Sequence, residues 1–452
     1  MIKVTFPETF TWGVSTSAYQ VEGYPLEDGA CPSNWHEFTH RPGTVKDGTN
    51  GDIACDHFHR YPEDIRAMAE MGLKGYRFSI AWTRIFPEPG KVNQKGLDFY
   101  SRLIDTLLAA GIQPWATIFH LEEPVWIARA GGMRNRSTVD HLVEFGTVLM
   151  QRFGDRVKNW ITINEPTIYA YSSFAIGEFP PGRKNDLHGM LRSVHHMLLA
   201  HSRLCGAFSS LVRGGMIGLA HHFLWVSPAD PGRSRDRQAA AFMDDAANGS
   251  VLDALHHRRY PEQFVRRLGR FLPRGFENDL GEMTPGTYQP INYYTRNRYR
   301  YSFILPFMHA TEYSDPRAPR SGQFEIYPQG IFKALLRLKN EYGNPPCVIT
   351  ESGYPAAETP GKDPLDDPER IAYLSDHVAM VGKAIEEGVD CRGYFVWCLL
   401  DNFEWNWGLA MRNGLLRTDY ETQQRQWKKS AFWYRDLARS NLLEVDTLPP
   451  VS

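Results

Sequence analysis

Two glutamates follow short apolar runs that lie far apart in the chain. Glu165 ends the run Trp160-Ile-Thr-Ile-Asn-Glu, and Glu351 ends the run Cys347-Val-Ile-Thr-Glu. Runs rich in Val, Ile and Thr favour strands, so each carboxylate is expected where a buried strand ends. Two carboxylates brought together at such a place can cleave a glycosidic bond, one as proton donor and one as nucleophile or base. A single glutamate after a strand is more often a solvated loop residue, so the interpretation depends on the pair.

The segments around these glutamates alternate between strand-length apolar runs and longer stretches with helical period. The eight apolar runs are Phe10–Ser15, Gly75–Ile80, Gln113–His120, Trp160–Glu165, Met216–His222, Tyr288–Tyr294, Cys347–Glu351 and Cys391–Leu399. The helical segments are Tyr61–Met71, Gly96–Ala110, Thr138–Phe153, Leu187–Phe208, Gly330–Tyr342 and Pro368–Glu387. The first of these is predicted to open with Pro62 in its first turn and to stop at Gly72.

This repeating pattern predicts an α/β fold, a (β/α)8 TIM barrel formed by a single domain over residues 1–452. A doubly wound open sheet is the alternative, but the chain has no glycine-rich phosphate turn after an early strand. Irregular stretches at about 177–186, 226–238, 295–323 and 354–367 follow the fourth to seventh runs. They are expected to be the long βα loops that form the mouth of the barrel.

The bulk composition excludes several classes of partner. The 50 basic and 52 acidic residues leave a net charge of -2 without blocks of like charge, so neither nucleic acid nor a membrane surface is an expected partner. The N-terminus lacks a signal-type segment, which favours a cytoplasmic location. The six cysteines have no Cys-x-x-Cys spacing and are expected to be reduced. The histidine pairs at 195–196, 221–222 and 256–257, with His57 and His59, lack ligand spacing, so structural roles, no metal and no cofactor are predicted.

Several motifs in chain order closely resemble family 1 glycoside hydrolases, the β-glucosidase family. The matching stretches are Thr16-Ser-Ala-Tyr-Gln-Val-Glu-Gly23, Tyr76-Arg-Phe-Ser-Ile-Ala-Trp-Thr-Arg-Ile85, Thr162-Ile-Asn-Glu-Pro166, Ile291-Asn-Tyr-Tyr294, Ile349-Thr-Glu-Ser-Gly353 and Val396-Trp-Cys-Leu-Leu-Asp-Asn-Phe-Glu-Trp405. The resemblance covers essentially the whole chain and implies a hydrolase of carbohydrate metabolism, a retaining exo-β-glycosidase acting on a small β-glycoside or oligosaccharide.

By this resemblance Glu165 is the general acid/base and Glu351 is the nucleophile that forms a covalent glycosyl-enzyme. Arg77 and Tyr294 match the residues that hold the nucleophile, and an adjacent guanidinium lowers a carboxylate pKa by about one to three units. An acid working near neutral pH needs a raised pKa, so Glu165 is expected to be partly buried and distant from cations.

The resemblance also implies a sugar-binding set of polar groups with one flat apolar surface, as a neutral polyol requires. The matching residues are Gln20, His120, Asn164, Glu404 and Trp405 for the hydroxyl groups, Trp397 under the sugar face, and Asn292 as support.

Four positions depart from the pattern of the family. Leu121 replaces a tryptophan beside the sugar 3-hydroxyl, Ser352 replaces an asparagine after the nucleophile, and Asn413 replaces a phenylalanine near C6. Phe324 stands where an aglycone-facing tryptophan is common. These departures predict weak activity on unmodified glucosides and better activity on a modified or deoxygenated sugar, or on one joined to a bulky aglycone.

Other functions remain open to different degrees. A transglycosylase that passes the glycosyl group to an alcohol would share every catalytic residue. A 6-phospho-β-glycosidase would replace Glu404 by serine and place Lys and Tyr in the next loop, whereas residues 405–413 contain neither. A sugar-binding protein without catalysis is the alternative of another class, and the presence of Glu165, Glu351, Arg77 and Tyr294 together argues against it.

Overall fold

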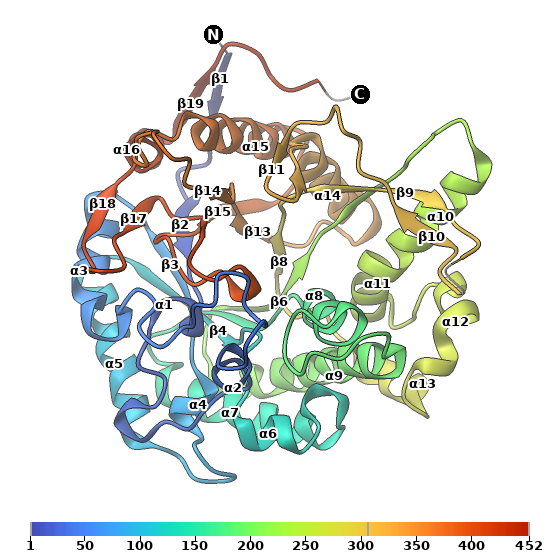
Figure 1. The fold of residues 1–452 in the computed structure, drawn as a ribbon, viewed down its shortest axis with the longest axis horizontal. Helices are drawn as coiled ribbons and strands as arrows, with labels where there is room; N and C mark the ends of the chain where they lie inside the picture. The colour runs from blue at the N-terminus through green and yellow to red at the C-terminus, as the bar shows by residue number, and fades with distance from the viewer. Residues whose placement is uncertain (1, 305–306, 451–452) are drawn as a thin grey trace.

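The computed structural model describes residues 2–304 and 307–450 of the 452-residue chain, and eight parallel strands form a closed barrel at its centre (Figure 1). The barrel strands are β2 (Thr11–Ser15), β3 (Gly75–Ser79), β4 (Gln113–Phe119), β5 (Asn159–Asn164), β6 (Met216–His222), β8 (Gln289–Asn292), β13 (Cys347–Ser352) and β15 (Cys391–Trp397). They neighbour one another in chain order, and β15 closes the barrel by pairing with β2 from Gly393–Thr11 to Trp397–Ser15. The predicted (β/α)8 barrel is therefore confirmed.

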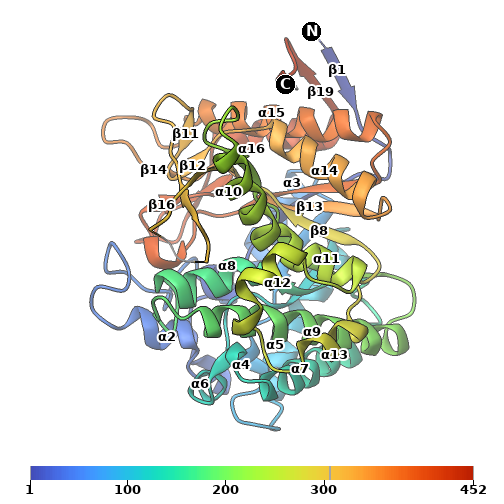
Figure 2. The same ribbon diagram turned by 90° about the vertical axis from the view of Figure 1, so that its right-hand side faces the viewer.

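Helices surround the barrel on its outer face, as Figures 1 and 2 show. The longer ones are α3 (His57–Glu70), α5 (Gln94–Ala109), α7 (Ser137–Phe153), α9 (Leu187–Leu211), α11 (Ser250–His257), α14 (Gln329–Glu341), α15 (Pro368–Glu386) and α16 (Lys429–Ser440). Local capping fixes some of their starts: the Asp186 side chain accepts a hydrogen bond from the Gly189 amide at 2.7 Å where α9 begins. Within the described residues, no helix is both long enough and apolar enough to cross a membrane.

Further helices and strands lie in the segments that connect these elements. The helices among them are α1 (Ala18–Val21), α2 (Asn34–Thr39), α4 (Trp82–Ile85), α6 (Val125–Arg129), α8 (Pro166–Ala170), α10 (Ser234–Asp244), α12 (Glu262–Leu268) and α13 (Phe276–Asp279). The strands among them are β7 (Trp225–Pro228), β9 (Arg296–Tyr301), β10 (Ala310–Glu312), β11 (Arg320–Ser321), β12 (Phe324–Glu325), β14 (Ala356–Ala357), β16 (Met411–Arg412), β17 (Leu416–Thr418) and β18 (Arg425–Trp427). The ends of the chain pair with each other, since β1 (Ile2–Thr5) lies antiparallel to β19 (Leu442–Val445).

Aromatic side chains fill the interior of the barrel. The ring of Phe395 on β15 lies 5.0 Å from that of Trp115 on β4, and both are buried. Glycines on two neighbouring strands make this possible, because a Cβ atom at Gly13 or Gly75 would lie 2.5–2.6 Å from the Phe395 ring. An added methyl group there would overpack the core, which typically costs about 1–3 kcal/mol. The apolar filling fixes the strands that carry polar side chains at their other end.

Helix α3 begins earlier than the sequence predicts. Its first residue is His57, and Pro62 lies inside the helix instead of opening it. The His57 imidazole pairs with the buried Asp64 carboxylate at 2.7 Å, and Arg425 contacts the same carboxylate at 2.8 Å. This buried cluster stabilises the extra turn, and local sequence patterns do not report a contact that spans so much of the chain.

The stretch 295–323 is also more regular than predicted, although 305–306 lie outside the described residues. Strand β9 pairs with β10 and with β7 in a three-stranded sheet. Arg298 on β9 contacts the Glu325 carboxylate at 3.0 Å, while Tyr299 packs in a buried cluster with Ala310. A strand with paired arginines on one face has a polar sequence, so its pattern predicts an irregular loop. All six cysteines are free, as predicted.

Candidate active site

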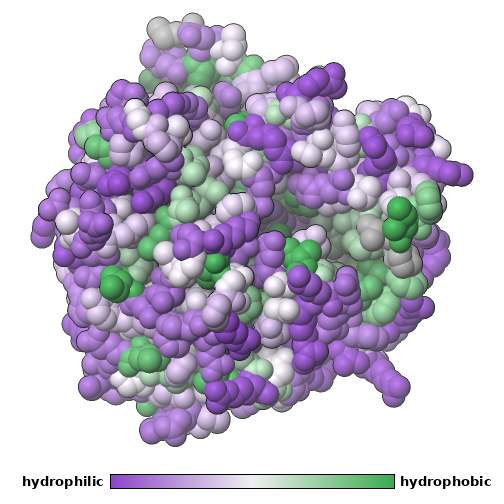
Figure 3. Space-filling view, in the orientation of Figure 1, coloured by the Kyte–Doolittle hydropathy of each residue, from purple (hydrophilic) through white to green (hydrophobic). Residues whose placement is uncertain are grey.

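All eight barrel strands send a candidate residue toward one end of the barrel. Following the strands from β2 to β15, these residues are Gln20, Arg77, His120, Glu165 with Asn164, His222, Asn292 with Tyr294, Glu351 and Trp397. The carboxyl ends of parallel barrel strands meet on the same face, which explains how residues so distant in sequence converge. The space-filling surface is hollowed to the right of its centre in the orientation of Figure 1 (Figure 3).

The two predicted carboxylates are both buried at this face. Glu351 lies within β13 and is 4% exposed, whereas Glu165 follows β5 and is 8% exposed. The backbone of Glu165 has a φ of 47°, a left-handed conformation that is unusual for a residue with a side chain. This turn ends the strand and starts α8.

A chain of hydrogen bonds connects the two carboxylates. Arg77 donates to Glu351 at 2.5 Å and to the side-chain oxygen Oδ1 of Asn164 at 2.7 Å. Asn292 donates to that same oxygen at 3.0 Å and to Glu165 at 2.8 Å. Because the Asn164 oxygen accepts from both sides, the orientation of its amide is fixed. The residues Arg77, Asn164 and Asn292 predicted from the sequence therefore form one network.

Glu351 is held by a fixed cation and a phenol. Its Oε1 accepts from Arg77, and its Oε2 accepts from the Tyr294 hydroxyl at 2.8 Å. Burial outweighs the opposing charge of Arg77 and raises the pKa of Glu351 to about 7. Both oxygens are positioned, but the carboxylate holds a proton more readily than the sequence led us to expect for a nucleophile.

Glu165 is held by a titratable cation that the sequence analysis missed. Nδ1 of His222 donates to Oε1 of Glu165 at 2.9 Å, and the imidazole stacks on the Tyr294 ring at a centroid distance of 5.8 Å. Burial alone would raise the pKa of Glu165, but the charge and hydrogen bond of His222 outweigh it and leave that pKa below its ordinary value. The pKa of His222 is correspondingly raised, since Glu165 outweighs the effect of burial. The expectation of a raised pKa at Glu165, distant from cations, is wrong.

The structural role predicted for the pair at 221–222 therefore holds for only one of them. His221 is buried and contacts the Asn248 side chain at 3.0 Å, away from the carboxylates. His222 ends β6, the strand that neighbours β5 in the barrel. Its position at the end of a predicted strand is the signal that could have identified it.

The residues predicted to bind the sugar hydroxyls gather around Glu404. Nε2 of Gln20 lies 3.3 Å from the Glu404 carboxylate, and Asn413 donates to the same carboxylate at 2.6 Å. Burial, opposed by the Asn413 hydrogen bond, raises the pKa of Glu404 to about 7. The side-chain oxygen Oδ1 of Asn413 is buried and has no partner among the described residues, so this departure adds an unused acceptor beside Glu404.

His120 lies between the two predicted tryptophans. Its ring stacks at 5.7 Å from Trp397 and at 6.2 Å from Trp405. The Asn164 amide nitrogen lies 3.1 Å from Nε2 of His120, and since that nitrogen can only donate, Nε2 accepts. Nδ1 therefore carries the proton, and it is buried without a partner in the described part of the chain. Burial keeps the pKa of His120 well below its ordinary value, so the ring is neutral and offers one free donor.

The other three departures adjoin residues of the site, either in sequence or in space. Leu121 is buried in a left-handed conformation with a φ of 65°, and its backbone oxygen accepts from the Trp35 indole at 3.0 Å. Phe324 packs against the Tyr294 ring at 5.6 Å. The buried Ser352 hydroxyl lies beside the phenol groups of Tyr373 and Tyr394.

Comparisons with known proteins agree with this geometry. The model of Glycosyl hydrolase family 1 matches residues 2–443. The chain is 41% identical over 444 residues to Beta-glucosidase A of Thermotoga maritima, which covers 97% of this chain and 99% of that protein. It is 38% identical over 455 residues to Beta-glucosidase A of Acetivibrio thermocellus, covering 98% and 100%.

Solved structures give the same result. The family 1 β-glucosidase from Thermotoga maritima superposes with a TM-score of 0.94 at 41% identity, covering 98% of this chain and 100% of that one. The β-glucosidase from the same organism in complex with glucoimidazole superposes with a TM-score of 0.93, covering 97% and 99% at the same identity.

Proposed function

This chain belongs to glycosyl hydrolase family 1 and is a glycoside hydrolase, and we propose from that premise that it removes a terminal β-linked sugar from a small glycoside with retention of configuration. The observation that carries the proposal is the pair of buried carboxylates, Glu165 and Glu351, joined through Asn292, Asn164 and Arg77. Retaining enzymes require two carboxylates near the same bond in different protonation states.

In the first step, the Glu351 carboxylate attacks the anomeric carbon and the bond to the leaving oxygen breaks. Glu165 supplies the proton that this oxygen needs, so that an alcohol departs and a glycosyl-enzyme ester remains. In the second step, Glu165 takes a proton from water, the water oxygen attacks the anomeric carbon, and Glu351 is released. The contacts of Arg77 and Tyr294 fix both oxygens of Glu351 for the attack, and both contacts favour the ionised form that attacks, in opposition to burial.

His222 gives the acid/base a proton source within the site. The reactive form needs a proton on Glu165, and the hydrogen bond from Nδ1 of His222 can pass a proton to Oε1 of that carboxylate. The proton reaches the leaving group once the carboxyl group has rotated to exchange its two oxygens. Glu165 and His222 share one proton, which can reside on either group. An aglycone that excludes water favours the arrangement with neutral Glu165 and neutral His222 over the ion pair of carboxylate and imidazolium. Both hydrogen bonds to Glu165 end on Oε1, and Oε2 has no partner among the described residues, so it is the oxygen able to meet the leaving group.

For the sugar, β-glucosides are the first candidates, because the relatives are named β-glucosidases and one related structure holds glucoimidazole. Gln20, His120, Glu404 and Trp405 support a polyol with several hydroxyl groups over the Trp397 indole. We further propose that the site favours an altered sugar over plain glucose. Leu121 offers no side-chain hydrogen bond, and Asn413 occupies one oxygen of Glu404.

A panel of nitrophenyl β-glycosides tests both levels of the proposal. We expect turnover of at least one of the β-glucoside, β-galactoside, β-fucoside, β-xyloside or deoxy-sugar substrates. The first-formed sugar should be the β-anomer by NMR. Formation of the α-anomer would contradict the retaining mechanism, and failure of every substrate would favour a binding protein. An alcohol acceptor in the same assay distinguishes transfer from hydrolysis.

The double variant Leu121→Trp with Asn413→Phe tests the sugar preference. It restores an indole donor and an apolar wall, so β-glucoside kcat/KM should rise by about 5-fold to 150-fold, as expected for roughly 1–3 kcal/mol of transition-state stabilisation. Phe324→Trp, which changes the aglycone side, is the matched control and should leave the ratio of sugar preferences unchanged. Ordinary glucosidase efficiency in the wild type, with no gain in the double variant, would contradict the altered-sugar proposal.

A further inference from the structure

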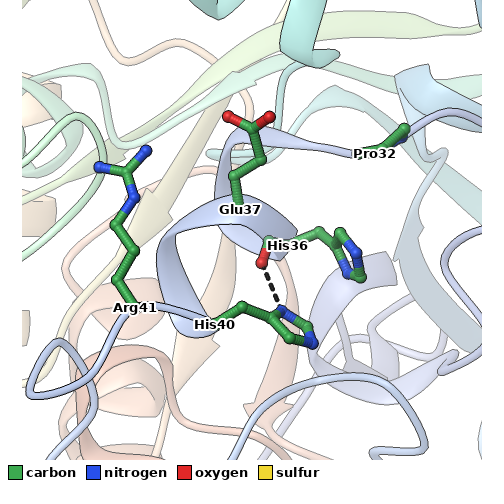
Figure 4. A pocket seen from close by; sticks show the side chains of 5 residues that line it. All are labelled: Pro32, His36, Glu37, His40 and Arg41. Atoms are coloured by element: carbon green, nitrogen blue, oxygen red, sulfur yellow. Dashed lines mark hydrogen bonds between the residues drawn. The ribbon is translucent and has the colours of Figure 1, made fainter.

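Two histidines and an aspartate converge on the surface beside α2, outside the catalytic network. His36 lies on α2, His40 follows its last residue, and Asp52 belongs to the loop that leads to α3. Their nitrogen and oxygen ligand atoms all lie within 4.8 Å of one another, and no other group of three such side chains does so in the part of the chain that the structure describes. Figure 4 shows the two imidazole rings on the same side of the helix, with Glu37 and Arg41 pointing elsewhere.

The hydrogen bond of one ring fixes which nitrogen is free. Nδ1 of His40 lies 2.6 Å from the backbone oxygen of His36, and because a carbonyl oxygen only accepts, Nδ1 carries a proton. In the neutral ring, Nε2 then presents a lone pair to the Asp52 carboxylate at 3.0 Å. Two acceptors at this distance repel unless a positive charge, either a proton on Nε2 or a metal ion, lies between them. An Nδ1 bond to a backbone oxygen is also the usual way in which a ligating histidine is oriented for a metal at Nε2.

The second ring contacts the same carboxylate in a geometry that is poor for a hydrogen bond. Nδ1 of His36 lies 3.3 Å from Oδ1 of Asp52. Both atoms are buried and neither has a hydrogen-bond partner among the described residues. Ligand atoms about 2.0–2.2 Å from a tetrahedral ion are about 3.3–3.5 Å apart, so this separation is the one that a shared metal requires.

We propose that His36, His40 and Asp52 form a binding site for a divalent transition metal, with Zn²⁺ as the best-fitting ion. Two imidazole nitrogens and one carboxylate suit Zn²⁺, whereas Mg²⁺ and Ca²⁺ prefer oxygen ligands throughout. Three protein ligands leave a fourth position for water. A shallow surface cavity of about 500 Å³, lined by Pro32, His36, Glu37, His40 and Arg41, gives the ion access from solvent.

The site joins two segments that support the sugar-binding wall. The neighbour of His36, Trp35, lies 4.5 Å from the Trp405 ring, centroid to centroid. The loop that carries Asp52 also holds the segment after Trp405, since Asp47 accepts from the Leu409 amide at 2.8 Å. A metal bound to both α2 and this loop would fasten them together. Its expected effect is on stability, because none of its ligands contacts Glu165 or Glu351.

Titration of the untagged, chelator-treated full chain with Co²⁺, followed by displacement with Zn²⁺, tests the site. We expect one equivalent to give d–d absorption bands and Zn²⁺ to remove them. His40→Gln and Asp52→Asn should each weaken binding by about tenfold or more. Saturating Zn²⁺ should raise the wild-type Tm by about 2–4 °C. None of these readouts depends on glycosidase activity, so failure here leaves the proposed function untouched.

His141→Gln is the matched control, since His141 is another exposed histidine beside an acid, 3.8 Å from Glu144. It should bind metal as the wild type does. Absence of Co²⁺ bands at about 100 μM protein and metal would overturn the proposal and identify a protonated histidine–aspartate cluster. Equal affinity in the wild type, His40→Gln and Asp52→Asn, or equal weakening in His141→Gln, would also overturn it. Far-UV circular dichroism checks that each variant is folded. If His40→Gln does not fold, Asp52→Asn is the smaller change and carries the test.

Discussion

Glu351 lies against Arg77 and Tyr294, whereas Glu165 lies against His222 and Asn292. The two carboxylates belong to the same barrel face and are both buried, yet one faces a guanidinium and the other faces an imidazole whose pKa is raised by Glu165. In proteins an imidazole can pass on a proton, whereas a guanidinium does not. Arg77 can position and stabilise a negative charge but cannot deliver a proton. His222 can stabilise the charge and can also deliver a proton. The difference teaches that the neighbours of each carboxylate, not its burial, distinguish a nucleophile from an acid/base.

The largest effect is expected at the nucleophile. Glu351→Ala should lower turnover by at least about 10⁴-fold on every substrate, because no other group can form the ester. Steady-state kinetics measure the loss, and a 2-deoxy-2-fluoro glycoside should add one glycosyl mass to Glu351 of the wild type. Glu369→Ala, an exposed glutamate on α15, is the control and should remain active. Labelling of another carboxylate would refute the assignment.

A smaller and selective loss is expected at the acid/base. Glu165→Ala should reduce turnover of poor leaving groups by about 10²–10⁴-fold and that of activated aryl glycosides much less, since only the former need a proton. Azide should restore part of the rate and yield the β-glycosyl azide, whereas azide with Glu351→Ala should yield the α-anomer. Product NMR separates the two. Equal losses on both types of leaving group would mean that Glu165 has another role.

Tyr294→Phe sharpens the comparison on the side of Glu351. It removes a hydrogen bond to the charged carboxylate, which is worth about 1.5–3 kcal/mol, so kcat/KM should fall by roughly 10-fold to 100-fold. A hydrogen bond to the ionised form lowers a pKa, so its loss raises the pKa of Glu351 from about 7. The acid limb of the pH profile should therefore move to higher pH. An unmoved acid limb would show that this limb does not report Glu351.

His222→Asn sharpens the comparison on the side of Glu165 and has the smallest expected effect. In the wild type the last proton can rest on either Glu165 or His222, whose pKa is raised by Glu165. In the variant it can rest only on Glu165, so it leaves at lower pH. The alkaline limb of kcat/KM should therefore move to lower pH. His257→Asn, an exposed histidine on α11, is the control. An alkaline limb that stays in place or rises would exclude the shared proton.

Much of this site could be predicted because the motif residues lie where strands end. A run such as Trp160-Ile-Thr-Ile-Asn-Glu encodes both a buried strand and the residue that follows it, and closure of the barrel then brings Glu165 near Glu351. The cytoplasmic location stays a prediction.

The amino-acid sequence by itself therefore determined the barrel fold and the positions of the two carboxylates and their main partners. Strand period and strand-end position are local properties of a sequence, which is why they can be predicted from it. Only the tertiary structure decided that His222 faces Glu165, that Arg298 pairs with Glu325, and that α3 starts at His57. It also decided which carboxyl group holds its proton more firmly. These properties depend on burial and on charges contributed by distant strands, and electrostatic energies over a few ångströms in a buried site are fixed by geometry that no local pattern encodes.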